Sequence, residues 1–329
     1  LSQFPKIAPK APTKKNRKDL TSQPSLIFKS WESSQAPYLQ AIHACPHEGG
    51  TRIWWHVPTI AERVGFGSKL DLSIRSRGEA LCLGNNWRPL LSDTLINASK
   101  FEPGKINEAI TLQVDIDKNG VPINWEFMTS TIKPVAIINS EHLELINKRK
   151  STSRTIPQKL KDIKLYIDQV QTIIHSAKLI NSIDKEQGAI ELDLKSEKVD
   201  NLSELRFDYP GRDFNGWQEP LNISEANSIL NTINRFSNKI YYKHSTSYKL
   251  PSIIKFNEKL TINSLNDIAK TALSLDAKFK LNNEAEFNIQ DILNTFQNDK
   301  NKRILHKTVK HNIPTNQLYF EDGQTQKNT

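Results

Sequence analysis

Between residues 25 and 135, hydrophobic and polar positions mostly alternate with the period of two that is typical of β-strands. The clearest case is residues 110–127, where two alternating runs are joined by Lys118-Asn119-Gly120. An Asn-Gly pair between two such runs favours a β-hairpin, because both residues adopt the positive φ angles of a tight turn. We therefore predict a hairpin. Its alternating positions are Ile110, Leu112, Val114, Ile116, Val121, Ile123, Trp125 and Phe127.

From residue 160 onward, hydrophobic residues recur every three or four positions, which indicates helices packed through one face. The first helix follows a basic connection over 147–161, and three more are predicted to begin at caps on Ser224, Ser264 and Asn288. A last helix is predicted near 299–312. The inward-facing residues predicted for the first four are Leu160, Ile163, Ile167, Val170, Ile174 and Ala177; Ala226, Ile229, Ile233, Phe236 and Ile240; Leu265, Ile268, Ala272 and Leu275; and Ile289, Ile292, Leu293 and Phe296.

Because strands precede helices instead of alternating with them, the predicted fold class is α+β. We expect a basic flexible linker over 1–24 and a single domain over 25–329. Within this domain a β-rich front half (25–146) packs on a helical back half (147–329). Residues 1–20 carry +5 of the net charge of +9, so the remainder is only mildly basic. A basic tail of this kind is often no more than a solvated linker.

Composition excludes some classes of protein. No hydrophobic run approaches the roughly 20 residues that span a bilayer, and no signal peptide is recognisable at the start. The two cysteines, Cys45 and Cys82, argue against a disulfide framework and are consistent with a reducing cytoplasm. Since the chain does not begin with Met, we expect it to be part of a longer protein.

Three motifs could be functional sites, but for each of them a purely structural role is the favoured interpretation. His43, Cys45 and His47 would share one face of a strand and could ligate zinc, but Pro46 is expected to interrupt that strand and no fourth ligand is evident. Neither cysteine lies in a motif of activated nucleophiles. Gly65-Phe66-Gly67 lacks the rest of any phosphate-binding motif and is predicted to be a turn.

Two clusters of basic residues are candidate RNA contacts. One lies in the connection before the first helix, and the other lies at steps of four and three on the last helix, so that its residues share a face. A run of charges is more often a solvated surface, and that alternative remains open. The clusters are Lys148, Arg149 and Lys150, and Arg303, Lys307 and Lys310.

Several segments in order resemble the ribonuclease II/ribonuclease R (RNB domain) family, and they look most like a divergent, cyanobacterial-type member. The resemblance covers roughly residues 25–320, and it is the order of the segments, more than any one motif, that carries it. The segments are Trp55-His56-Val57-Pro58-Thr59, Gly67-Ser68-Lys69-Leu70-Asp71, Arg88-Pro89-Leu90-Leu91-Ser92, the hairpin Asp115–Phe127, Gly188-Ala189-Ile190-Glu191-Leu192-Asp193-Leu194 and Pro251-Ser252-Ile253.

This resemblance implies the fold of a 3′-to-5′ exoribonuclease, in which a single RNA strand passes through a basic channel to a magnesium site. OB-fold barrels flank such domains and would be absent from this chain. Single-stranded RNA is the expected partner, together with other RNA-degradation proteins, in the cytoplasm and away from membranes.

The chain departs from the family at the metal site. Active members carry Asp, five residues, then Asp-x-Asp-Asp-Ala, because two magnesium ions need hard oxygen ligands. When Ala41 is placed on the motif's Ala, none of the four aspartates is present, and Thr59 stands where His-Ile-Ala-Asp has its own Asp. The chain also ends before the family's Thr-Ser-Pro-Ile-Arg segment. The degenerate metal-site positions are Trp31, Pro37, Leu39, Gln40 and Thr59.

The leading hypothesis is therefore an RNB protein that binds RNA and lacks magnesium-dependent hydrolysis, with no catalytic residue and no cofactor in this chain. The alternative is a catalytically silent adaptor that docks on a ribonuclease or ribosomal partner. A third hypothesis keeps activity in a longer protein that uses acidic residues beyond 329.

Overall fold

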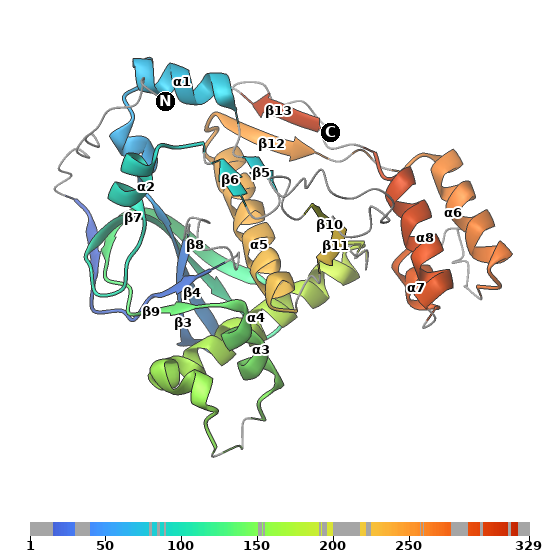
Figure 1. The fold of residues 1–329 in the computed structure, drawn as a ribbon, viewed down its shortest axis with the longest axis horizontal. Coiled ribbons are helices and arrows are strands. Elements are labelled where there is room, and N and C mark those ends of the chain that lie inside the picture. The colour runs from blue at the N-terminus through green and yellow to red at the C-terminus, as the bar shows by residue number, and fades with distance from the viewer. Residues whose placement is uncertain are drawn as a thin grey trace, which may run out of the picture. The chain divides into compact units, whose positions relative to one another are not determined.

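A mixed seven-stranded sheet organises the first part of the computed structural model, in the order β1-β8-β7-β4-β3-β2-β9. Figure 1 labels β3, β4, β7, β8 and β9 of this sheet. The pairs β1–β8 and β2–β9 are parallel and the other neighbours are antiparallel. The strands are β1 Lys18–Leu20, β2 Leu26–Phe28, β3 Gln40–His47, β4 Gly50–Pro58, β7 Asn107–Ile116, β8 Pro122–Ile132 and β9 Ala136–Ile138. The structure describes residues 16–29, 40–78, 81–83, 86–88, 90–150, 153, 155–190, 192, 196–199, 218–221, 225–256, 258, 260–277, 289–296, 299–314 and 317–321.

Helices and three two-stranded sheets account for the other described elements, and the α+β class is confirmed. Three α-helices and one 3₁₀ helix lie in the part predicted to be mainly strand: η1 Ile60–Arg63, α1 Lys69–Arg77, α2 Asp93–Ser99 and α3 Ser140–Lys148. The later helices are η2 Gln158–Tyr166, α4 Ile167–Glu186, α5 Glu225–Ser247, α6 Ile262–Ser274, α7 Ile289–Asn294 and α8 Asp299–Asn312. The small sheets pair β5 Leu81–Leu83 with β6 Asn86–Arg88, β10 Ser196–Val199 with β11 Gln218–Leu221, and β12 Ser252–Phe256 with β13 Gln317–Glu321.

The chain divides into two compact units, and the division does not follow the predicted boundary at residue 147. Unit 1 comprises residues 1–179 and 196–233, and unit 2 comprises 180–195 and 234–329. The core of unit 2 is formed by α6, α7 and α8, where Ile268, Ile292, Leu305 and Val309 are almost wholly buried.

The predicted hairpin is confirmed as β7 and β8. Asp117 holds its turn, because its Oδ1 accepts hydrogen bonds from the backbone N–H groups of Asn119 (2.9 Å) and Val121 (2.8 Å). Gly120 has a φ of 93°, which glycine adopts without a Cβ clash. A bulge near Asp115 and Ile116 shifts the register at this end of the ladder, and Ile123 is 67% exposed there.

The helical periodicity also predicted burial correctly. All six residues of the first stripe, from Leu160 to Ala177, are buried, although the segment begins as the 3₁₀ helix η2 and becomes α-helical at Ile167. In α5, Ile229, Ile233, Phe236 and Ile240 are buried as predicted. The expected caps Ser224 and Asn288 lie outside the described residues.

The predicted cap of α6 was wrong by one turn. The helix begins at Ile262, and Thr261 is its N-cap, with Thr261 Oγ1 accepting from the backbone N–H of Ser264 at 3.1 Å. Ser264 is therefore the third helical residue and not the cap. Thr and Ser both suit this role, so the local pattern could not choose between them.

Pro46 does not interrupt its strand, contrary to expectation. It lies within β3 opposite Thr51 of β4. On the other side of β3, pairing with β2 extends only over Gln40–Ile42, so no strand in the described part of the chain needs an N–H from Pro46. Proline is tolerated at such an edge position.

Part of the predicted linker belongs to the sheet. Lys18–Leu20 form β1, which runs parallel to Ser130–Ile132 of β8, and Leu20 is buried. Residues 16–24 are therefore a described part of unit 1, whereas 1–15 lie outside the described residues.

Candidate functional site

Two of the five positions predicted to form a degenerate metal site lie at the same end of two neighbouring strands of the large sheet. Strand β3 begins at Gln40 and its antiparallel neighbour β4 ends at Pro58, so Gln40 and Thr59 are brought to the same end of this pair. The side chain of Gln40 is buried, and its Oε1 accepts a hydrogen bond from Trp55 Nε1 at 2.9 Å. Trp31, Pro37 and Leu39 lie outside the described residues.

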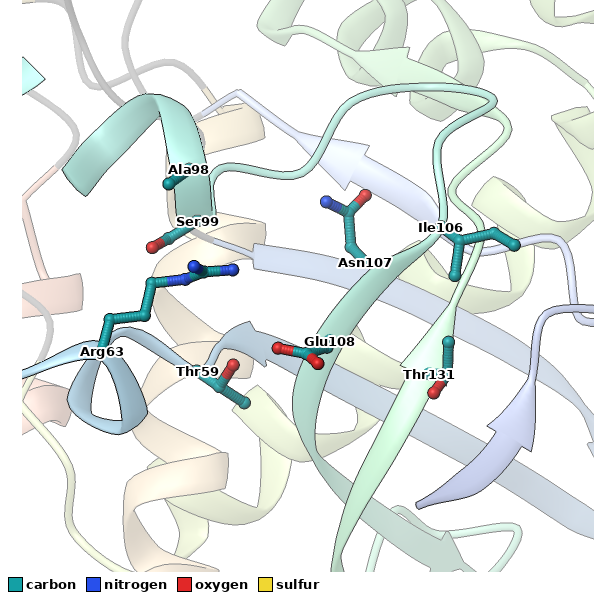
Figure 2. Close-up of a pocket in the computed structure, with 8 residues that line it drawn as sticks. All are labelled: Thr59, Arg63, Ala98, Ser99, Ile106, Asn107, Glu108 and Thr131. Atoms are coloured by element: carbon teal, nitrogen blue, oxygen red, sulfur yellow. The ribbon is translucent and has the colours of Figure 1, made fainter. Parts of the chain in front are cut away.

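Thr59 lies in the wall of a cavity of about 470 Å³, and it is itself only 4% exposed. It is the N-cap residue of η1, with a φ of −81° and a ψ of 54°. In Figure 2, Arg63 reaches into the cavity from η1 while the carboxylate of Glu108 enters from β7. The described lining residues are Thr59, Arg63, Ala98, Ser99, Ile106, Asn107, Glu108 and Thr131.

A buried arginine sets the charge beside this cavity. The side chain of Arg17 is 7% exposed, donates a hydrogen bond to Glu62 Oε2 and has its Nε 3.9 Å from Glu108 Oε1. Glu108 is the one carboxylate among the described lining residues, and it already has Arg17 as a neighbouring cation. No local sequence pattern singles out Arg17, because its partners Glu62 and Glu108 lie far along the chain.

The described donors do not fit the metal site of active family members. Gln40 offers a neutral amide oxygen that Trp55 already engages, and Thr59 offers a neutral hydroxyl. Among the described residues, no group of three or more His, Cys, Asp and Glu side chains is arranged to hold a metal ion. Magnesium prefers charged carboxylate oxygens, which neither of these two described side chains offers.

A buried polar chain crosses the sheet next to this end of the two strands. His56 Nδ1 lies 2.7 Å from Thr111 Oγ1, which lies 2.6 Å from Ser130 Oγ, and all three residues are completely buried. Burial lowers the pKa of His56 to about 3, with a smaller contribution from nearby His43, so the imidazole is neutral at physiological pH. His56 Nε2 is buried and has no hydrogen-bond partner.

The candidate zinc ligands share one strand face but have separate partners. His43 Nδ1 lies 3.1 Å from Pro24 O and from Gln169 Nε2, whereas His47 Nε2 lies 2.7 Å from Arg52 Nη2. Burial lowers the pKa of His43 and raises that of the Cys45 thiol. The side chain of Cys82 lies outside the described ones.

The two predicted RNA-contacting clusters lie in different units. Lys148 ends α3 and is exposed, as is Lys150, while Arg149 donates a hydrogen bond to Ser153 O. On α8 the second cluster is exposed on the side opposite buried Leu305 and Val309. It consists of Arg303, Lys307 and Lys310.

Comparison with known proteins identifies the family. A family model for the RNB domain matches residues 17–328. The chain belongs to the RNB domain family. No curated protein sequence matches this RNB chain. Of the described helices, none is long and apolar enough to cross a membrane.

Solved structures with the same fold include both nucleases and a pseudonuclease. RNase R of Mycoplasma genitalium in complex with single-stranded RNA matches with a TM-score of 0.76 and 15% identity, over 93% of this chain and 46% of that one. Yeast Ssd1, described as a pseudonuclease, matches with 0.73 and 16%, over 97% and 37%. An active-site mutant of the Dss1 exoribonuclease from Candida glabrata matches with 0.63 and 12%, over 92% and 36%. The RNB chain thus spans less than half the length of these proteins.

Proposed function

We propose that this chain binds single-stranded RNA and does not perform magnesium-dependent hydrolysis. The observation that carries the proposal is that Gln40 and Thr59, which the sequence resemblance places on family aspartates, offer only a neutral amide oxygen and a neutral hydroxyl at the ends of β3 and β4. Hydrolysis by two metal ions needs carboxylates to clamp both ions, and neutral oxygens supply neither the charge nor the affinity. The three positions outside the described residues carry Trp31, Pro37 and Leu39, none of which has a side-chain oxygen.

RNA binding is supported by family membership and by surface charge. RNase R, which shares this fold, was solved with single-stranded RNA bound. The exposed side chains of Lys148, Lys150, Arg303, Lys307 and Lys310 provide cations that phosphates attract. Ssd1 supports the other half of the proposal, since a protein with this fold is described as a pseudonuclease. We place the activity in cytoplasmic RNA degradation or processing, alongside active nucleases.

The test combines binding and hydrolysis in one preparation. A 5′-labelled single-stranded RNA is mixed with the protein, first without metal to measure affinity and then with Mg²⁺ to follow its 3′ end. We expect binding without shortening of the RNA, and a catalytically active RNB exoribonuclease serves as the positive control. Stepwise 3′-end trimming that EDTA abolishes would contradict the loss of hydrolysis, and an absence of binding would contradict the RNA-binding half.

The adaptor hypothesis has one observation of its own. Ile253 of β12 and Phe320 of β13 are direct cross-strand partners, and they are 71% and 72% exposed. Exposed hydrophobic pairs are found at protein interfaces. Salt separates the two functions, because contacts with phosphates weaken steeply as ionic strength rises and a mostly apolar protein contact does not.

A further inference from the structure

The C-terminal end of α5 presents tyrosines and lysines to solvent in unit 2. Tyr248 is 68% exposed, Tyr242 48% and Tyr241 43%, and Lys243 and Lys249 are also exposed. We call these five residues the tyrosine surface. Isolated exposed aromatic residues are common on protein surfaces. Here three exposed tyrosines occur within eight consecutive residues.

The sequence around the tyrosine surface contains basic residues and no acidic ones. Residues 226–257 contain five basic residues and no Asp or Glu. Among the described residues one carboxylate reaches this helix: Asp184 of α4, which lies 2.6 Å from Lys239 Nζ and 3.6 Å from Arg235 Nη2. No described carboxylate forms an ion pair with Lys243 or Lys249. The local field favours a polyanion.

Three basic residues of α5 form a row along the helix axis. Arg235, Lys239 and Lys243 are spaced four residues apart, so each lies about 6 Å farther along the helix axis than the one before. The ring of His244 lies 4.6 Å from that of Tyr248 and is tilted by 43°. Lys249, two residues beyond the last residue of α5, has a φ of 52°, and the N–H of Leu250 donates a hydrogen bond to Ser245 O at 2.8 Å, which holds the last turn in place.

Helix stability by itself explains only part of this arrangement. Cations near a helix C-terminus interact favourably with the helix dipole, which accounts for Lys249. It does not account for the exposure of Tyr242 and Tyr248. Exposed aromatic rings beside cations are the combination with which proteins bind single-stranded nucleic acids, because every base offers a face for stacking and every linkage a phosphate.

We propose that the tyrosine surface binds single-stranded RNA, with bases stacked on Tyr242 and Tyr248 and with Lys243 and Lys249 at the phosphates. This inference rests on the proposed RNA binding, and it adds a second contact surface to the clusters on α3 and α8. Stacking on two side chains makes the contact tolerant of sequence, so a uridine oligonucleotide is a suitable probe.

The test compares RNA with heparin, a polyanion that has no bases. Affinities are measured by fluorescence anisotropy for wild type, for Tyr242→Ala/Tyr248→Ala and for the matched Tyr242→Phe/Tyr248→Phe, with thermal melting as a check of folding. We expect the alanine variant to bind the oligonucleotide about tenfold or more weakly and heparin unchanged. The phenylalanine variant, which keeps both rings, should bind RNA like wild type.

A second pair of variants tests the lysines. Lys243→Gln/Lys249→Gln should reduce the slope of log affinity against log salt by about 1.4. Lys118→Gln/Lys164→Gln, which removes two exposed lysines of unit 1, is the control for the loss of charge. In addition, an oligonucleotide with photoreactive 4-thiouridine should crosslink within residues 241–249, as mapped by mass spectrometry.

The outcomes separate the two proposals. If wild type binds RNA and the alanine variant binds it equally well, or loses heparin binding to the same extent, the tyrosine surface is not a stacking site. Crosslinks that fall entirely elsewhere lead to the same conclusion. If wild type does not bind the oligonucleotide at all, the RNA-binding function and this inference fail together.

Discussion

At the scale of single residues, His56 couples the stability of the sheet to pH. Its folded pKa is about 3, below the ordinary value of 6.5, because burial disfavours the charged imidazolium. The unfolded chain therefore binds a proton that the folded chain does not. The resulting stability is fully present above pH 6.5 and is lost as the pH falls toward 3.

We expect wild type to lose up to about 1.4 kcal/mol of unfolding free energy per pH unit through His56 in this range. His56→Asn, measured by urea unfolding across the same range, should have a smaller slope although it is less stable overall. Part of the slope should remain, because burial also lowers the pKa of His43. His311→Asn, at an exposed position of α8, is the control. Identical slopes for His56→Asn and wild type would contradict the prediction.

Arg17 shows how one side chain can change the assignment of a segment. It lies in what the composition suggested to be a linker, yet its guanidinium is almost buried between Glu62 and Glu108. Arg17→Ala leaves the nearly buried carboxylate of Glu62 without this partner, so we expect a loss of about 3 kcal/mol in unfolding free energy. Its exposed neighbour is the control: Lys18→Ala should cost less than about 0.5 kcal/mol in the same urea titration. Equal effects would show that Arg17 is not structurally important.

At the scale of elements, the start of α6 tests the corrected capping residue. Thr261 Oγ1 satisfies the N–H of Ser264, one of the otherwise unpaired donors of the first turn. Thr261→Ala should therefore cost about 1 kcal/mol, whereas Ser264→Ala should cost only a few tenths. Thermal melting of both variants decides between them. A larger loss for Ser264→Ala would restore the cap expected from the sequence.

Elements differed in how well local sequence predicted them. The hairpin of β7 and β8 and the buried stripe from Leu160 to Ala177 were predicted correctly, because turn chemistry and periodicity act between neighbours in the chain. The helices α1 and α2 were missed. Ser68 and Ser92 cap them, but both helices are short, and few of their side chains are buried. Short helices therefore leave little periodic signal.

At the scale of the whole molecule, the salt dependence of RNA affinity should reveal how many Lys and Arg side chains contact phosphates. Replacing Arg303, Lys307 and Lys310 with glutamine should reduce the slope of log affinity against log salt by about 2 if all three meet phosphates. Replacing Lys148 and Lys150 should reduce it by less, about 1.4. Fluorescence anisotropy over a salt series measures both. Affinity that is unchanged in both variants would favour the adaptor.

The sequence alone determined the family, the α+β class, the hairpin and the helical stripes. Periodicity and turn residues act between neighbours in the chain, and the order of segments is a property of the sequence itself. The replacement of the family's aspartates stays a prediction from the sequence. Only the tertiary structure decided what surrounds those positions, because the partners are distant along the chain. Gln40 meets Trp55, Arg17 meets Glu62, and the neutral state of His56 follows from burial against Thr111. These contacts form only when the sheet brings remote segments together.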